Sequence, residues 1–160
     1  MEDGLFKGLK VLDCASFIAA PAAATVLSDF GADVIKIEPP GAGDPYRNLP
    51  NLPGYPKSEH NYAWMMESRN KKSLALDLAK PEGREVLYKL AAEADVFITN
   101  FPPPVRKKLK IAYEDIAPLN DRLLCLLHRL WRQGRRGRQA RLRLHGLVGT
   151  LGHDGSCARR

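Results

Sequence analysis

The sequence has few cysteines, no long apolar run and no recognisable set of metal ligands. Its three cysteines, Cys14, Cys125 and Cys157, form no C-x-x-C pair. This spacing argues against a zinc ribbon, a redox motif or a disulfide framework and favours a reducing, cytoplasmic compartment. No stretch approaches the roughly 20 apolar residues of a membrane span, and the N-terminus shows no signal-peptide pattern. The four histidines are scattered without an H-E-x-x-H motif, so we expect no metal site.

A glycine-rich phosphate-binding loop is also lacking. Residues 13–20, which follow the first expected strand, contain no glycine, whereas a dinucleotide fold needs glycines there for the backbone to approach a pyrophosphate. Glu38 occupies the position of a ribose-binding acid, but without the glycines a solvated strand end is the simpler interpretation. Cys14, Ser16 and His60 could be read as a hydrolase set, yet no G-x-S-x-G surrounds Ser16, and Cys14 is typical of a small buried strand residue. The sequence therefore argues against both NAD binding and nucleophilic hydrolysis.

The positive charge of the chain lies at one end. The 160 residues carry a net charge of +7. Residues 1–125 hold 16 Lys and Arg against 17 Asp and Glu, whereas residues 126–160 hold nine Arg, no Lys and the single acid Asp154. Because two compositions meet near residue 125, we expect a folded domain over residues 1–124 and an Arg-rich, irregular tail over residues 125–160.

The first part alternates between strand and helix patterns. β-Branched or apolar runs predict strands at residues 10–13, 33–38, 73–78 and 95–101. Helices are expected to open at Pro21, before an Ala-rich run that Gly31 ends, and at Pro81, with shorter ones at residues 61–67 and 105–109. Residues 39–56 hold six of the twelve prolines and predict a loop. The alternation indicates an open α/β sheet with parallel strands and flanking helices.

In such a sheet, ligands bind beyond the carboxyl ends of the strands. Here these ends are residues 14–20, 38–44 and 99–104. Two short basic clusters, residues 69–72 and 106–110, are compatible with a solvated surface or with an anion site for phosphates. Asn100 and Phe101, followed by three prolines, are compatible with a seat for a heteroaromatic group or with a strand cap.

Several blocks of the sequence together resemble one family. They are Gly8-Leu9-Lys10-Val11-Leu12-Asp13, Pro21, the run from Phe30 to Pro40 with Gly43-Asp44-Pro45-x-Arg47, the run from Asn70 to Leu78, Pro81-Glu82-Gly83-Arg84, and Ala94-Asp95-Val96 with Asn100-Phe101. In order and spacing these blocks resemble the opening of the class III CoA-transferases, the family of formyl-CoA transferase, carnitine CoA-transferase and α-methylacyl-CoA racemase. The resemblance covers about residues 5–123.

The resemblance implies a Rossmann-like CoA-binding domain, incomplete relative to the longer family members. Its implied CoA contacts are Ile18, Ala19, Leu76, Asp77, Leu78, Asn100, Phe101, Pro102 and Lys108, the last reaching a phosphate of CoA. Two positions depart from the family pattern: Pro39 replaces an arginine, and Pro104 replaces a glycine.

The resemblance also implies acyl-CoA and a carboxylic acid as substrates and an aspartate nucleophile. That aspartate attacks the acyl-CoA carbonyl and gives an anhydride, then an aspartyl-CoA thioester. It belongs to a G-D-x-x-x-G context beyond the matched residues, so no catalytic residue is assigned, Asp154 included. The family forms interlocked homodimers, a topology we do not expect this chain to complete. The alternatives are a racemase-like protein, which shares this N-terminal region, and a non-catalytic CoA-binding module.

The composition of the tail suggests translation out of frame. Trp131 has the single codon TGG, and before an arginine codon CGN the frame one base later must read GGC, glycine. With permitted synonymous codons, residues 125–137 re-read as A-S-F-T-G-Y-G-D-K-G-A-E-A, which resembles the continuation of the family. The alternative is an Arg-rich segment that binds nucleic acid through its charge, with Trp131 stacking on a base. We favour the first interpretation.

Overall fold

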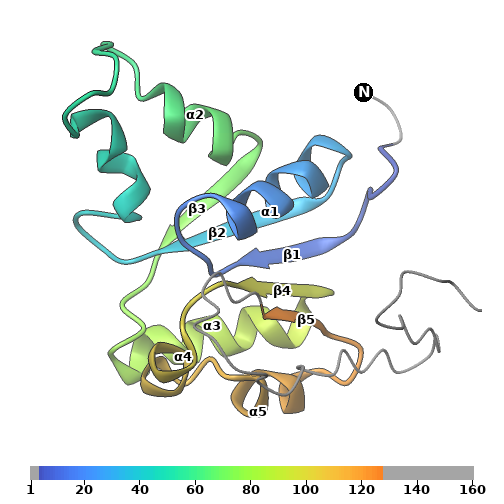
Figure 1. Ribbon diagram of the computed structural model, residues 1–160. Coiled ribbons are helices and arrows are strands. Elements are labelled where there is room, and N and C mark those ends of the chain that lie inside the picture. Colours follow the sequence, from blue (N-terminus) through green and yellow to red (C-terminus); the bar gives the residue numbers. More distant parts are fainter. Residues whose placement is uncertain (1–3, 128–160) are drawn as a thin grey trace, which may run out of the picture.

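A computed structural model describes residues 4–127 of the chain (Figure 1). In chain order, the elements are β1 (Lys10–Asp13), α1 (Ala19–Asp29), β2 (Asp33–Glu38), the 3₁₀ helix η1 (Pro45–Asn51), α2 (Tyr62–Ser68), β3 (Lys71–Ala75), α3 (Pro81–Glu93), β4 (Val96–Thr99), α4 (Pro103–Leu109), α5 (Tyr113–Ile116), the 3₁₀ helix η2 (Ala117–Leu119) and β5 (Leu124–Leu127). In this part of the chain, no helix is long and apolar enough to cross a membrane.

The five strands form one parallel sheet with the order β3-β2-β1-β4-β5. The chain moves outward from β1 through β2 to β3 and then returns to place β4 on the other side of β1. This reversal creates a switch point between β1 and β4, where the loops that leave the two strands diverge. The predicted α/β fold with parallel strands and flanking helices is confirmed.

Helices cover both faces of the sheet, so the core has two parts. Figure 1 shows α1 and α2 on one side and α3, α4 and α5 on the other. The α3 side packs Leu12, Leu87 and Phe97 into a cluster in which Leu87 and Phe97 are fully buried. The α1 side buries Val11 and Val34 against small α1 residues. Alternate strand residues therefore serve opposite layers, as the period of two in a strand requires.

Two strands end at other residues than the sequence predicts, because side-chain contacts or the pairing with a neighbouring strand determine where they end. The third strand runs over Lys71–Ala75 rather than residues 73–78, because its partner β2 ends at Glu38, which lies opposite Ala75. The fourth strand stops at Thr99 rather than residue 101, because the side chain of Asn100 bonds to the loop after β1. The predicted loop 39–56 contains η1, whose first turn is capped by Asp44.

β5 crosses the compositional junction near residue 125. It pairs with β4 from Leu124 to Leu127, and Cys125 packs against the α3-side core. The ordered strand therefore reaches three residues beyond the expected domain limit at residue 124. Of the Arg-rich tail expected over residues 125–160, residues 128–160 lie outside the described residues, and with them most of the segment re-read as frame-shifted and the alternative nucleic-acid role of Trp131.

Candidate functional site

The loops that follow β1 and β4 are joined by one amide side chain at the switch point. The Asn100 Oδ1 atom accepts from the Ser16 backbone N–H at 2.9 Å, and the Asn100 Nδ2 atom donates to the Ser16 carbonyl at 2.7 Å. The Asn100 side chain thus satisfies both backbone polar groups of Ser16, as the backbone of a neighbouring strand would. It therefore fixes the two carboxyl ends at the place where open α/β sheets bind ligands.

The next residue, Phe17, adopts a left-handed backbone conformation with φ of 62°. This conformation is uncommon for an aromatic residue. It turns the chain into α1 and leaves the side chains of Phe17 and Ile18 exposed by 49% and 48%. Ile18 is the N-cap of α1, and the exposed Ala19 is its first residue. Residues 17–19 thus form an exposed apolar segment after β1, whereas Phe101, which follows β4, is partly buried against the α3-side core.

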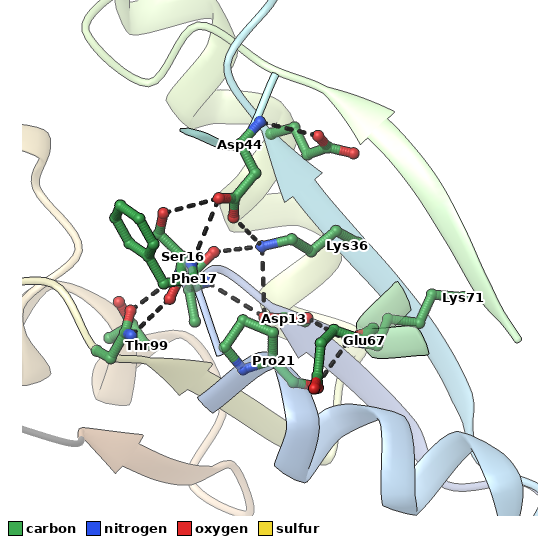
Figure 2. A network of polar contacts seen from close by, with 12 residues as sticks. Asp13, Ser16, Phe17, Pro21, Lys36, Asp44, Glu67, Lys71 and Thr99 are labelled. Carbon is green, nitrogen blue, oxygen red and sulfur yellow. Dashed lines mark hydrogen bonds and ion pairs between the residues drawn. The ribbon is translucent and has the colours of Figure 1, made fainter. Parts of the chain in front are cut away.

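Four charged side chains lie next to this turn and form what we call the buried charge cluster: Asp13, Lys36, Asp44 and Lys71. Their side chains are exposed by 3% or less. The Lys36 ammonium lies 3.0 Å from Asp44 and 3.8 Å from Asp13, and the Lys71 ammonium lies 2.9 Å from Asp13. Figure 2 shows the Lys36 ammonium between the carboxylates of Asp44 and Asp13, beside Ser16 and Phe17. The two carboxylates and the two ammonium groups have a net charge of zero, and buried charges need such partners.

Burial shifts the pKa of Lys71, which belongs to this cluster, and of Cys14, which lies beside it. Burial is the larger influence on Lys71 and lowers its pKa, although the Asp13 carboxylate opposes this. Burial also raises the pKa of the Cys14 thiol to about 12, with Lys36 offsetting part of the effect. A thiol with so high a pKa stays protonated at neutral pH and is a poor nucleophile. Ser16 donates its hydroxyl to Asp44 at 3.0 Å. These contacts agree with the expectation that Cys14, Ser16 and His60 form no hydrolase set.

A second polar unit ties the loop after β2 to the sheet. The Glu38 carboxylate accepts from the Arg47 guanidinium at 2.7 and 2.8 Å, from Ser73 at 2.9 Å and from the Asp44 backbone N–H at 3.0 Å. Burial would raise the pKa of Glu38, but these hydrogen bonds, that of Arg47 foremost, outweigh it and hold the pKa at about 2. Arg47 also stacks on Trp64, 3.8 Å from the ring centre. Glu38 is therefore a structural anchor and not a solvated strand end.

The structure brings the implied CoA contacts to one edge of the sheet but not to one point. Asn100, Phe101 and Pro102 follow β4 and adjoin the Ile18–Ala19 segment through the Asn100 contact. The other strand-end group, Leu76, Asp77 and Leu78, follows β3, which two strands separate from β4. There Leu78 is buried in the core, and Asp77 accepts from the Ala79 backbone N–H at 3.1 Å. Lys108 is exposed near the end of α4.

Sequence reasoning did not single out the buried charge cluster. A signal was present, because Lys36 alternates with Val34 in a run of β-branched residues and so shares the face that Val34 buries. A lysine on a buried strand face needs a carboxylate partner. Its partner Asp44 lies within the predicted loop, where the sequence pattern does not fix side-chain positions. No group of three or more potential metal ligands occurs within residues 4–127.

The strand order with its switch point defines an open, doubly wound α/β protein without a dinucleotide-binding glycine loop. Comparison with known proteins gives the family. The family described as CoA-transferase family III matches residues 6–150. The chain therefore belongs to CoA-transferase family III, whose members use CoA thioesters.

Individual relatives agree with this assignment. The chain is 41% identical over 120 residues to the beta subunit of succinyl-CoA–L-malate CoA-transferase from Chloroflexus aurantiacus, a match that covers 74% of this chain and 29% of that protein. It is 42% identical over 113 residues to cinnamoyl-CoA:phenyllactate CoA-transferase from Clostridium sporogenes, covering 70% and 27%. A CAIB/BAIF family protein from Brucella suis has a crystal structure that superimposes with a TM-score of 0.68 at 35% identity, covering 78% of this chain and 33% of that one. The chain thus spans less than a third of the length of these two curated relatives.

Proposed function

We propose that the protein binds the CoA part of an acyl-CoA at the crevice between β1 and β4 and serves the transfer of CoA to a carboxylic acid. The observation that carries this proposal is the Asn100–Ser16 contact, which fixes the loops after β4 and β1 against each other at the switch point of the sheet. The two curated relatives named above are both CoA-transferases, which favours transfer over racemisation.

The reaction exchanges one thioester for another. The acyl–sulfur bond of the donor breaks, the donor acid leaves as a carboxylate, and the acceptor carboxylate becomes the new thioester. The resemblance implies that an aspartate carries the acyl and CoA groups between the two acids. Among the described residues, none is proposed for that role, because the resemblance places the aspartate in a G-D-x-x-x-G context beyond the matched residues. The described residues are proposed to bind and orient the CoA part.

Within the crevice, different groups suit different parts of CoA. The apolar surface of Phe17 and Ile18 can pack against an adenine ring or an aliphatic chain. The exposed Lys108, with its neighbour Lys107, can pair with phosphates. A ligand that combines a nucleotide, phosphates and a flexible chain matches this succession of surfaces. Leu76, Asp77 and Leu78 are proposed as a second contact further along the same edge.

Calorimetric titration of CoA into the purified 160-residue chain tests the proposal. We expect saturable binding, and about tenfold weaker binding for Lys108→Ala, because a charge-assisted contact contributes about 1.5–3 kcal/mol. Lys89→Ala is the matched control, since Lys89 is an exposed lysine on α3. Equal weakening by both substitutions would assign the effect to net charge alone. An absence of binding by the unsubstituted chain would refute the proposed site.

A further inference from the structure

Asp44 connects the loop after β2 to the proposed CoA-binding turn after β1. One oxygen of its carboxylate, Oδ1, accepts from the Ser16 hydroxyl at 3.0 Å, from the Phe17 backbone N–H at 3.3 Å and from the Tyr46 backbone N–H at 2.9 Å. The other oxygen, Oδ2, lies 3.0 Å from the Lys36 ammonium. Asp44 therefore has one oxygen for the two loops and one oxygen for its counter-ion.

The local sequence alone does not favour the left-handed turn that Asp44 contacts. Phe17 has a φ of 62° and an exposed side chain, so neither backbone sterics nor burial of its ring favours this conformation. Instead, the peptide unit between Ser16 and Phe17 is held from two sides. Asn100 bonds to both backbone polar groups of Ser16, and Asp44 accepts from the next N–H along the chain.

The charge arrangement explains why Asp44 stays in this place. Asp13 lies opposite Lys36 in the β1–β2 register, so their side chains share one face of the sheet. Lys36 reaches from there to Asp44 and to the Ala15 carbonyl, while Lys71 supplies the charge that Asp13 needs. A carboxylate with 3% exposure requires such a partner. Lys36 thus orients Asp44, and Asp44 orients the turn.

We propose that Lys36 and Asp44 are positioning residues for CoA binding: through the Asp44 Oδ1 atom they hold the left-handed turn at Phe17 in the conformation that presents Phe17 and Ile18 to the ligand. The inference rests on the proposed function for its ligand. It adds that affinity is set by a buried ion pair that touches no part of CoA.

Two readouts on the 160-residue chain test the inference, and only one of them needs CoA. The first is the hydrogen-exchange rate of the Phe17 backbone amide, with the amide of the fully buried Phe97 as the reference for an intact fold. The second is the affinity for CoA by calorimetry. Asp44→Asn keeps an Oδ1 acceptor of equal size but removes the charge that pairs with Lys36. We expect Phe17 exchange to accelerate and CoA affinity to fall, each by tenfold or more.

Ser16→Ala gives a milder variant in case Asp44→Asn does not fold. It removes one of the three bonds to Asp44 Oδ1 and leaves the charges in place. We expect about threefold changes in both readouts with Phe97 exchange unaltered. Ser28→Ala is the matched control, because Ser28 is also nearly buried and its hydroxyl bonds away from the turn, to the Thr25 carbonyl at 2.7 Å and to the Arg69 carbonyl at 3.4 Å. It should change neither readout.

The outcomes separate this inference from the proposed function. If the unsubstituted chain binds no CoA, the proposed function fails, and the exchange rates alone decide whether Asp44 holds the turn. If the chain binds CoA and Ser16→Ala behaves like Ser28→Ala in both readouts, the positioning role is wrong although the site stands. Faster exchange at Phe17 and Phe97 alike would also overturn it, because it would show a general loss of stability.

Discussion

Replacing Glu38 with glutamine should reveal how much the anchored carboxylate stabilises the sheet edge. Its pKa lies at about 2 in the folded chain against 4.5 for a free glutamate. This difference corresponds to about 3 kcal/mol. Because the Arg47 side chain is 36% exposed, water screens its interaction with Glu38 and reduces this stabilisation to about 2 kcal/mol. Because the folded pKa is depressed, this stabilisation is complete above pH 5 and is lost as the pH falls toward 2.

Urea unfolding of the wild type and Glu38→Gln at several pH values measures the effect. We expect the difference in unfolding free energy to be about 2 kcal/mol at pH 7, and more than half of it to disappear between pH 5 and pH 3. Taking the difference removes the contribution of the other carboxylates. Glu85→Gln, at an exposed position on α3, should show almost no difference at any pH. A Glu38→Gln difference that stayed constant from pH 7 to pH 3 would refute the charge argument and assign the loss to packing.

Substitutions at Gly43 and Phe97 test the fold, and sequencing of the gene tests the tail. Gly43→Ala should destabilise the chain by about 1–3 kcal/mol in urea unfolding, because φ is 69° and the new Cβ would lie 2.8 Å from the Glu38 carboxylate; Gly41→Ala, with φ of 81° and open space around it, should cost less. Phe97→Ala should cost about 3–5 kcal/mol, seen as a lowered thermal midpoint, since Phe97 is fully buried. Sequencing the gene between codons 123 and 125 should show an insertion or deletion relative to an intact homologous gene, and an uninterrupted frame would contradict the frame-shifted tail.

The order of strands and helices was predictable because local signals agreed with the final fold. Residues 10–13 and 33–38 form strands at the predicted limits, and α3 begins at Pro81 as its proline and first-turn acids indicate. The limits that differ depend on contacts distant in sequence. β3 ends where Glu38 ends its partner strand, and β4 ends where Asn100 turns toward Ser16. Neither contact leaves a trace in the local pattern.

The candidate site was predictable at the level of the sheet edge but not at the level of its supports. Placing the ligand at the carboxyl ends follows from parallel strands alone. The buried charge cluster depends on which strands become neighbours, because Lys36 meets Asp13 only through the β1–β2 register. It depends also on a loop residue, Asp44, that lies 28 positions from its partner Ser16. A sequence scan for motifs has no means to pair these residues.

The two polar units of the site meet in one residue, Asp44. The backbone N–H of Asp44 donates to Glu38, while its side chain accepts from Ser16 and faces Lys36. The Glu38 anchor therefore fixes the backbone from which the Asp44 carboxylate projects. Loosening the anchor should then reach the turn at Phe17 through Asp44, even though Glu38 touches no residue of that turn in the described contacts. The loop after β2 thus supports both the sheet edge and the proposed CoA-binding turn, through Asp44 and Arg47, which lie three residues apart.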